Sequence, residues 1–436
     1  MVVGENKPRP RRGTERDRVV YVYLRCGNTS RRRFGEWYRS HSHTTIAAEY
    51  ESQEHSNDSQ DVNIIMDTDI KAYFVAVHGG AGFHELSEAA DTRVKQALRL
   101  ACKYSLERLS ADCCAIDAVD KAISTLEDDP CLNAGYGSNL TLDGTVECDA
   151  SIMDGRSEDF GAVGAVSGVK NPIKAAHAVL QHSRVQDALG RIPPLSLAGG
   201  GAALFAHHKN LECVPPESLI CPRTKQEWEM WKSQLELAEK LSRDHATTED
   251  KDKFRRIQDT VGAVAWDTNG GMAAGVSSGG LLLKVPGRIG EAAVYGAGCW
   301  ASERKVDDVQ GVACSVSGSG EYIVRMMLAK TVADAVLSSP EDDVHDSLQR
   351  ILNEFHDTCR SRGETSPSAG ILLLVKEVND DRVTPRLWCA FTTHSMAVGY
   401  ASSLHPKPKA MILRRPTPRD DNRARSIYIT TLPLTG

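Results

Sequence analysis

The feature that most limits how this chain folds is a pair of apolar, strand-like runs joined by a tight turn. The runs are "TVGAVAWD" and "MAAGVSS", and the turn "TNGG" at 268–271 lies between them. An Asn-Gly turn between β-forming segments is typical of a β-hairpin. The first run begins abruptly at Thr260, directly after Asp259 and a charged segment. We therefore expect a hairpin whose first strand begins at Thr260.

Strand-like and helix-like patterns each cluster along the chain instead of alternating. The run "KAYFVAV" at 71–77 is followed by two amphipathic helical patterns, and a further helix is expected over 321–337. Further strand-like runs lie at 293–298, 311–316, 370–375 and 387–393. Because regular β-α-β alternation is missing, the pattern favours largely antiparallel sheets with helices layered outside them.

The two ends of the chain differ from its body. Residues 1–70 are polar with little periodicity, which is typical of a disordered extension. The first 40 residues hold 11 Lys and Arg against 4 Asp and Glu, although the whole chain has a net charge of −6. Such a basic tail is a nuclear-import segment, a weak nucleic-acid contact or a solvated extension. The acidic remainder argues against nucleic acid as the principal ligand. From about His405 the chain is rich in Pro and Arg, and we expect it to be loose.

A charged segment, 223–259, precedes Thr260. Residues 223–256 hold 9 Lys and Arg and 8 Asp and Glu. Its first part, "WEMWKSQLELAEKLSRD", has apolar residues roughly on one helical face. Its second part has almost nothing to bury, so we expect an exposed, cleavable linker that ends at Thr260.

Several classes of protein are excluded by what the sequence lacks. No apolar run approaches the ~18 residues that span a bilayer, so we expect no membrane partner. Twelve cysteines without a CxxC motif resemble scattered intracellular thiols. Together with the basic tail as a nuclear-import segment, they lead us to expect the protein in the nucleus and cytoplasm. There is no HExxH or GxSxG motif and the histidines show no metal-ligand spacing, so we expect no metal or organic cofactor.

The bond between Asp259 and Thr260 has two interpretations. It is either a polar strand start or a bond that is cut to make Thr260 a new amino terminus. A free α-amine has a pKa of about 7.7–8.0, so it can act as the base for the threonine's own hydroxyl. The β-methyl group restricts χ1, and the strand that follows holds the residue on a rigid element.

Two Gly-rich turns supply further candidate groups. Arg288 lies between Gly287 and Gly290 in "PGRIGEAAVYGAGCW", where it is either a surface arginine or a bidentate ligand for a carboxylate. In "SVSGSGEYIVR", backbone N–H groups can form an oxyanion hole. His78, beside Gly79 and Gly80, is more typical of packing at a strand end.

Four segments, "VHGGAGFH", "NAGYGSNLTLDGTVECDASIMDG", "DTVGAVAWDTNGGMAAGVSSGG" and "PGRIGEAAVYGAGCW", resemble the asparaginase-type N-terminal-nucleophile hydrolases. The resemblance covers roughly residues 71–400 and is greatest to the threonine-aspartase branch. It implies a four-layer αββα sandwich made as a proenzyme. It also implies that cleavage gives an α subunit ending at Asp259, with its hydrolase part at 71–259, and a β subunit of 260–436. These subunits are expected to associate as α2β2.

The resemblance also assigns roles to single residues. It makes Thr260 the nucleophile and Ser278 its polar supporter. It places Ser317 and Gly318 at the oxyanion hole and Asn133 near the scissile bond.

Three further assignments concern the substrate and self-cleavage. Arg288 matches the arginine that binds an aspartyl carboxylate, and the Gly79-Gly80 turn matches the loop that influences self-cleavage. The residue three after that arginine is generally aspartate in the asparaginases, where it binds the α-amine of the substrate. Here it is Glu291, which is one methylene longer and can still attract an amine.

The activity implied by this resemblance is that of a self-processing threonine endopeptidase that cleaves protein substrates after aspartate. Asp259 would then mirror the substrate, and nuclear regulators of the trithorax/MLL class are the implied targets. The alternative is an asparaginase or isoaspartyl dipeptidase acting on small β-aspartyl substrates. A third interpretation is an unprocessed interaction protein that retains the fold.

Overall fold

The computed structural model describes residues 72–82, 84, 87–240, 259–304, 309–338, 343–379, 382–416 and 427–433. The basic extension at 1–70 lies outside these residues, and so does the segment 241–258 before Thr260. The predictions about disorder, nuclear import and a cleavable linker in those segments therefore stay predictions.

The predicted hairpin is confirmed. Strand β5 (Val261–Trp266) pairs antiparallel with β6 (Met272–Ser278), and every residue of both strands is buried. The turn is held by Asp267, whose Oδ1 accepts hydrogen bonds of 2.8 Å from the backbone N–H groups of Asn269 and Gly271. Because both faces of the hairpin are covered, it lies in the interior of a layered structure.

The strands form two sheets. The first has eight strands in the order β12-β11-β1-β5-β6-β2-β3-β4, and the second has five in the order β13-β10-β9-β8-β7. Besides the hairpin, the first sheet contains β1 (Phe74–Gly82), β2 (Cys148–Asp154), β3 (Phe160–Val166), β4 (Ser196–Ala198), β11 (Ser395–Ser402) and β12 (Lys409–Arg414). The second contains β7 (Cys299–Ser302), β8 (Val309–Gly318), β9 (Ala369–Asn379), β10 (Arg382–Phe391) and β13 (Tyr428–Leu432). Apart from the parallel pair β3–β4, all paired strands run antiparallel, as predicted.

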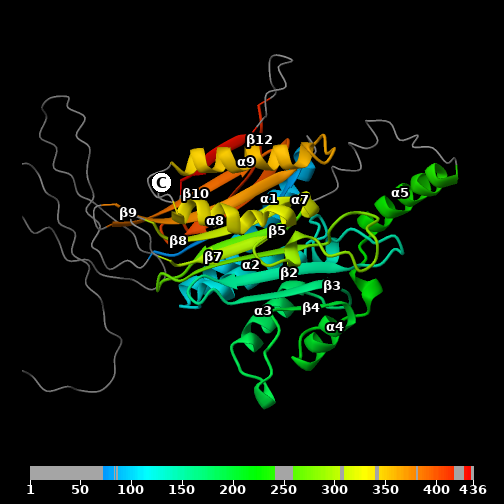
Figure 1. Cartoon of the computed structure of the whole chain (residues 1–436), viewed down its shortest axis with the longest axis horizontal. Helices are drawn as coiled ribbons and strands as arrows, with labels where there is room; N and C mark the ends of the chain where they lie inside the picture. Colours follow the sequence, from blue (N-terminus) through cyan, green and yellow to red (C-terminus); the bar gives the residue numbers. More distant parts are fainter. Residues whose placement is uncertain are drawn as a thin grey trace, which may run out of the picture. The chain divides into compact units, whose positions relative to one another are not determined.

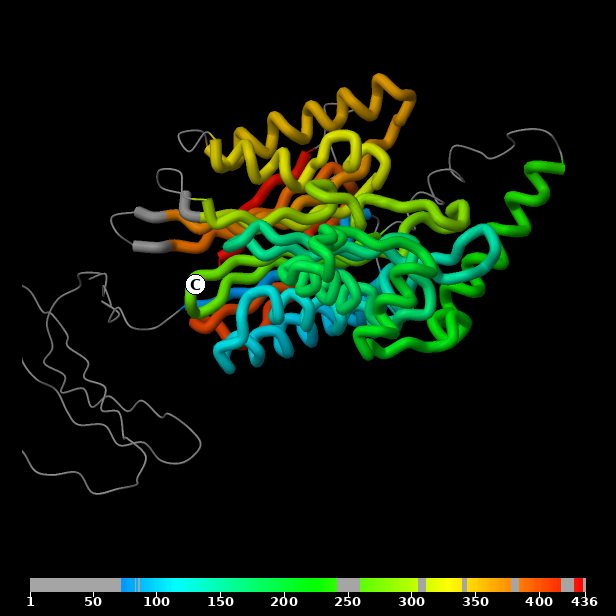
Figure 2. The backbone as a smooth tube through the Cα atoms, turned by 60° about the horizontal axis from the view of Figure 1, so that its bottom comes forward, coloured from blue at the N-terminus to red at the C-terminus, as the bar shows by residue number. Residues whose placement is uncertain are grey.

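Helices cover the outer faces of the two sheets. The helices are α1 (Glu88–Ser110), α2 (Ala115–Glu127), α3 (Pro172–Ser183), α4 (Gly199–His208), α5 (Pro222–Lys240), α7 (Gly320–Met326), α8 (Leu328–Ser338) and α9 (Val344–Arg360). One buried cluster joins α1, α2 and α3 to the first sheet, and the other fills the space between the sheets and beneath α8 and α9. Figures 1 and 2 show the resulting order of helices, two sheets and helices. This arrangement confirms the predicted αββα sandwich.

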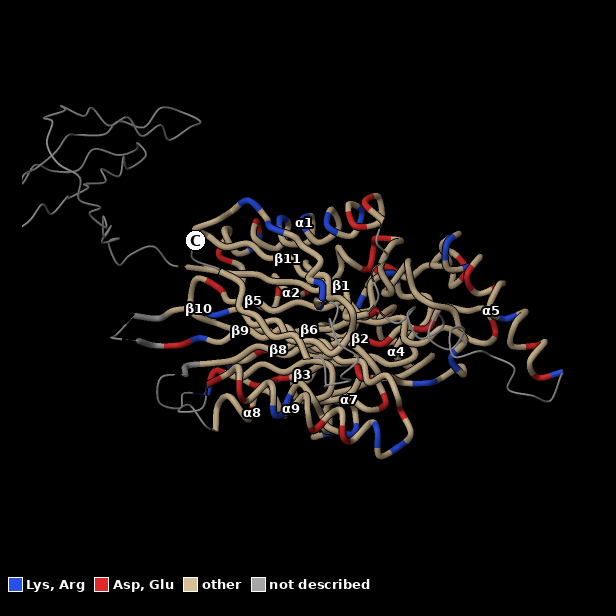
Figure 3. Tube along the Cα trace, turned by 90° about the horizontal axis from the view of Figure 1, so that it is seen from above, with Lys and Arg blue, Asp and Glu red and all other residues tan. Residues whose placement is uncertain are grey.

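The distribution of charged residues matches the layers of the structure. In Figure 3 the Lys, Arg, Asp and Glu residues lie mainly along the helices, whereas the central strands carry few of them. Among the described residues no helix is both long enough and apolar enough to cross a membrane. Helix α5 extends away from the sheets (Figure 1), and it forms the described part of the charged segment before Thr260.

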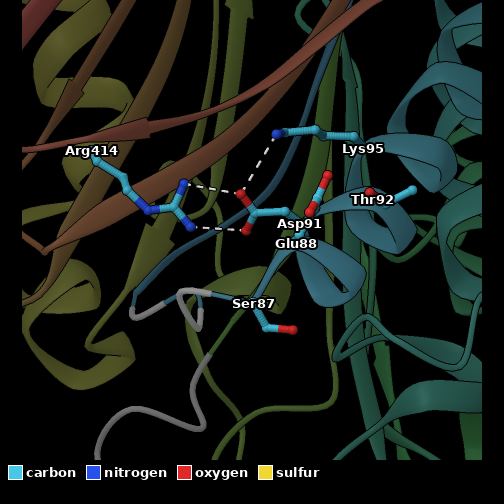
Figure 4. A pocket seen from close by; sticks show the side chains of 6 residues that line it. All are labelled: Ser87, Glu88, Asp91, Thr92, Lys95 and Arg414. Atoms are coloured by element: carbon cyan, nitrogen blue, oxygen red, sulfur yellow. Dashed lines mark hydrogen bonds and ion pairs between the residues drawn. The ribbon is translucent and has the colours of Figure 1, made fainter.

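Three sequence-based expectations were wrong. The strand-like run at 293–298 is not a strand, because the chain leaves the 3-10 turn Glu291–Ala293 and turns again at Gly296, which has φ of 76°, so that β7 begins only at Cys299. The single helix predicted over 321–337 is divided into α7 and α8, because Met327 adopts a left-handed conformation with φ of 45°. The chain after about His405 is not loose throughout, because it supplies β12 and β13 to the two sheets. Figure 4 shows how β12 is held: Arg414 contacts both carboxylate oxygens of Asp91 on α1, at 2.8 and 3.1 Å.

Candidate active site

Thr260 lies immediately before strand β5, in the middle of the eight-stranded sheet. Its side chain is buried, and its hydroxyl has two acceptors within hydrogen-bond distance. These are Ser278 Oγ at 3.1 Å and Glu291 Oε1 at 3.0 Å. Ser278 Oγ in turn accepts a hydrogen bond of 2.9 Å from the backbone N–H of Gly280. The structure therefore brings together the predicted nucleophile, its predicted polar supporter and a carboxylate.

Glu291 begins a single 3-10 turn, Glu291–Ala293, and its side chain is buried. Burial raises the pKa of this carboxyl to about 7, although Arg288 and the Thr260 hydrogen bond act in the opposite direction. A carboxyl with this pKa changes its charge near neutrality while in contact with the candidate nucleophile. It is therefore suited to accept the Thr260 hydroxyl proton before any free α-amine exists.

This arrangement predicts the pH dependence of self-cleavage. The rate should rise as pH increases through about 7, because the deprotonated Glu291 carboxylate is the better proton acceptor. Glu291→Gln should slow self-cleavage about 100-fold and flatten the profile, since an amide keeps the shape but cannot take the proton. The measurement is the rate of fragment appearance on gels, after a pulse of cell-free synthesis, from about pH 5.5 to about pH 8.5. Glu291→Asp, which keeps a carboxyl, should retain a pH-dependent rate. Identical profiles for the wild type and Glu291→Gln would contradict the role.

Arg288 lies on the loop before Glu291, and its side chain is largely buried. Its Nε donates a 2.9 Å hydrogen bond to Glu321 Oε1, and its Nη2 lies 2.8 Å from the same oxygen. The backbone of Gly290 approaches so closely that a Cβ there would lie 2.7 Å from Nη1. The backbone N–H of Gly290 is held by Asp149 Oδ2 at 2.8 Å. The proposed binding of a substrate carboxylate by Arg288 stays a prediction, since Glu321 is its partner in this structure.

Asp259 does not lie against Arg288 but against Gly80. A Cβ on Gly80 would lie 2.6 Å from the Cβ of Asp259, and Gly80 has φ of +102°, which side-chain-bearing residues rarely adopt. Asp259 Oδ1 is buried without a hydrogen-bond partner among the described residues, and burial raises the pKa of the carboxyl. Gly79 faces Leu98 and Leu132 instead. Of the two glycines, Gly80 is thus the one in contact with the acyl side of the predicted cleavage point.

Asn133 supports the turn that follows Ser278. Its Nδ2 donates to the carbonyl of Gly280 at 2.9 Å, and its own carbonyl accepts from the N–H of Gly279 at 2.9 Å. Its Oδ1 accepts from the N–H of Asn139 at 2.8 Å. Asn133 therefore positions the 279–280 turn that carries the N–H bonded to Ser278.

Ser317 and Gly318 end strand β8 and pair with Gly370 and Ala369 of β9. Ser317 Oγ accepts a 3.1 Å hydrogen bond from the N–H of Ala81, the residue after Gly80. This bond connects the predicted oxyanion segment to the strand that carries the Gly79-Gly80 turn. The oxyanion role itself stays a prediction.

His78 is part of a buried hydrogen-bonded chain. Its Nε2 lies 2.9 Å from Ser315 Oγ, which donates to the carbonyl of Gly275 at 2.9 Å, so Nε2 carries the proton in this network. Burial lowers the pKa of His78 to about 4, so the ring is neutral. This environment agrees with the packing role expected from the sequence.

Sequence reasoning missed two carboxylates at the site. Glu321 is the first residue of the helix predicted over 321–337 and has no role at the site in that prediction, and Asp149 is not singled out by the sequence. Asp149 also accepts from the N–H of Ala165 at 2.8 Å, and it therefore joins β3 to the Arg288 loop. The signal that could have identified Glu321 is its place three residues after Gly318, in a Gly-rich turn at the same end of the sheet.

Comparison with known proteins gives one consistent result. A family model described as asparaginase matches residues 71–364, which is more than half of the chain. Isoaspartyl peptidase of Escherichia coli is 35% identical over 283 residues, covering 64% of this chain and 81% of the relative. Isoaspartyl peptidase/L-asparaginase of Mus musculus is 38% identical over 256 residues, covering 59% and 70% respectively. Plant-type L-asparaginase of Thermococcus kodakarensis is 37% identical over 262 residues, covering 60% and 79%. The chain therefore belongs to the asparaginase family of N-terminal-nucleophile hydrolases.

Proposed function

We propose that this enzyme is a self-processing threonine hydrolase that cleaves polypeptides after aspartate, that is, a threonine aspartase (taspase). The observation that carries the proposal is the identity of the residue before the nucleophile. Self-cleavage at Thr260 would itself hydrolyse an ordinary α-peptide bond after an aspartate, Asp259. Such a reaction would mean that the nucleophile attacks the carbonyl of an aspartyl residue within a polypeptide, although the Asp259 side chain contacts Gly80 and a substrate aspartate would contact Arg288.

The self-cleavage step uses the contacts around Thr260. The hydroxyl oxygen attacks the carbonyl carbon of Asp259, and its proton passes to the carboxylate of Glu291. The peptide C–N bond then breaks, and the nitrogen of Thr260 takes that proton as it leaves. The product is an ester between Asp259 and the Thr260 oxygen. Water hydrolyses this ester, which releases the carboxyl terminus of the α subunit and a free amino group on Thr260.

Turnover of substrate repeats the same chemistry with a new base. The free amine of Thr260 takes the hydroxyl proton as the oxygen attacks the carbonyl of the substrate aspartate. Arg288 binds the side-chain carboxylate of that aspartate, and the backbone amides of Ser317 and Gly318 stabilise the developing oxyanion. The leaving amine takes the proton, and water hydrolyses the resulting ester.

A second candidate function is the hydrolysis of small β-aspartyl substrates or asparagine. The names of the relatives favour it, since they are isoaspartyl peptidases and L-asparaginases. Glu291 also favours it, because a carboxylate 3.0 Å from the nucleophile can attract the α-amine of a small substrate.

The two candidates are separated by the product that is released. Purified, processed enzyme is incubated with a peptide containing one internal aspartate, with a β-aspartyl dipeptide and with asparagine. The proposal expects cleavage after the aspartate of the peptide and little free aspartate from the two small substrates. Rapid release of aspartate from the dipeptide, with the peptide intact, would replace the first candidate by the second.

A further inference from the structure

The binding edge of Arg288 is already occupied by a carboxylate of the protein itself. Glu321 offers one oxygen, Oε1, to both Nε and Nη2. Nη2 is buried, and its contact at 2.8 Å is an ion pair without hydrogen-bond geometry. Two oxygens placed opposite the two N–H groups of a guanidinium edge make a stronger pair than one shared oxygen. The Glu321 contact is therefore one that a better-placed carboxylate can replace.

The other side of the guanidinium, at Nη1, is blocked by backbone atoms of the protein. Nη1 faces the backbone of Gly280 and Gly290, where added Cβ atoms would lie 2.9 and 2.7 Å away. Since no substrate group fits there, a substrate carboxylate has to use the edge that Glu321 now occupies.

The exposure of the two side chains indicates which of them can move. The Arg288 side chain is 14% exposed, whereas that of Glu321 is 53% exposed. A half-exposed carboxylate can turn into water at little cost, because an ion pair with an exposed partner contributes little to stability. Arg288 is held by its surroundings, so Glu321 is the partner that leaves.

The charges around Arg288 also indicate that a substrate carboxylate replaces Glu321 and does not bind beside it. Glu291 Oε2 and Arg288 Nη2 both approach Gly320, so a second carboxyl already lies beside the guanidinium. If Glu321 stayed in place, a bound aspartyl side chain would put three carboxyl groups around one cation.

We propose that Glu321 is a specificity-determining residue that acts as an internal competitor for Arg288, and that only a ligand carrying its own carboxylate displaces it. This inference rests on the proposed function of Arg288 as the ligand of the substrate carboxylate. Binding is then an exchange of one ion pair for another. A ligand without a carboxylate leaves the Arg288–Glu321 pair in place and gains nothing from Arg288.

The test is the binding of free aspartate and the hydrolysis of the single-aspartate peptide by processed wild type and Glu321→Gln. Removal of the competitor should lower the Kd for aspartate and the KM for the peptide about threefold to fivefold, with kcat nearly unchanged. Wild-type binding should depend weakly on salt, because one ion pair replaces another. In Glu321→Gln it should weaken markedly with added salt, because a new pair forms. Asparagine, which lacks the side-chain carboxylate, should gain less than aspartate from the substitution.

The matched control is Glu377→Gln, since Glu377 pairs with Arg386 at 3.1 Å on β9 and β10, outside this site. It should change neither constant. A higher Kd for aspartate in Glu321→Gln would overturn the proposal and make Glu321 a support for Arg288. An unchanged Kd would overturn it as well. Calorimetry with aspartate needs no turnover, so an enzyme that binds aspartate but leaves the peptide intact would count against the proposed function alone.

Discussion

Thr260→Ala is expected to leave the chain as a single piece of 436 residues without hydrolase activity, whereas the wild type should separate into fragments of 259 and 177 residues. The substitution removes the hydroxyl that contacts Ser278 and Glu291 and leaves no oxygen to attack the Asp259 carbonyl. Loss of a nucleophile that forms a covalent intermediate typically lowers the rate by about 10⁶-fold. Intact mass and amino-terminal sequencing measure the result, and the smaller wild-type fragment should begin Thr-Val-Gly-Ala.

A matched control is available on the same hairpin. Thr268→Ala removes a threonine hydroxyl that donates to the exposed Asp112 at 2.9 Å, and it should cleave at the wild-type rate. Thr260→Ser keeps an attacking oxygen but loses the methyl group that restricts χ1, so it should cleave slowly. A wild-type chain that stays uncut and inactive, like Thr260→Ala, would favour the interaction-protein interpretation.

Arg288→Ala is expected to reduce kcat/KM for an aspartyl peptide by about 30-fold or more, because truncating a buried partner of a charge pair costs about 2–5 kcal/mol. Self-cleavage should continue at a similar rate at alkaline pH, because Asp259 packs against Gly80 and not against Arg288. Near neutrality it should be slower, because loss of the Arg288 charge raises the pKa of Glu291. Steady-state kinetics measure the first effect, and gels of freshly synthesised chain measure the second.

The informative result is the difference between the effect of Arg288→Ala on substrate hydrolysis and its effect on self-cleavage. Arg288→Lys keeps the charge but loses the planar fork, so it should lie between alanine and the wild type. Equal loss of both reactions in a folded Arg288→Ala protein, checked by circular dichroism, would mean that one arginine serves both the chain's own aspartate and the substrate. It would contradict the separation of Asp259 from Arg288.

Part of the candidate site can be predicted from the sequence, because the register of the hairpin decides which residues lie opposite each other. A turn centred on 268–271 pairs Trp266 with Met272, and continued pairing then places Val261 opposite Ser277. The same register puts Thr260 beside Ser278, so the hairpin alone brings together the predicted nucleophile and its predicted supporter. The layering of helices outside largely antiparallel sheets was predictable for a similar reason, since clustered strand patterns leave few ways to bury their apolar faces. The four-layer αββα order was implied only by the family resemblance.

The rest depends on contacts between segments far apart in the chain. The pairing of Arg288 with Glu321 joins a loop to a helix start 33 residues later. Hydrophobic periodicity in the sequence does not predict such a contact. The contact of Asp259 with Gly80 joins residues that no local rule brings together. The strand at 409–414 was not predicted because its apolar run, "AMIL", is short and stands among Pro- and Arg-rich residues. It is a partly buried edge strand that depends on pairing with β11 and on the Arg414–Asp91 contact.

The order of strands in the eight-stranded sheet has a consequence for refolding after the proposed cleavage. Strand β1, which precedes Thr260, lies between β11 and β5, which follow it, and β2 pairs with β6 across the same divide. The two fragments of the proposed cut would therefore share both sides of one sheet and stay associated in the native state. After unfolding, two separate chains would have to meet by diffusion, whereas the uncut chain folds alone. Refolding of the cut protein would then depend on its concentration, and in dilute solution the cut protein would refold far less readily than the uncut chain.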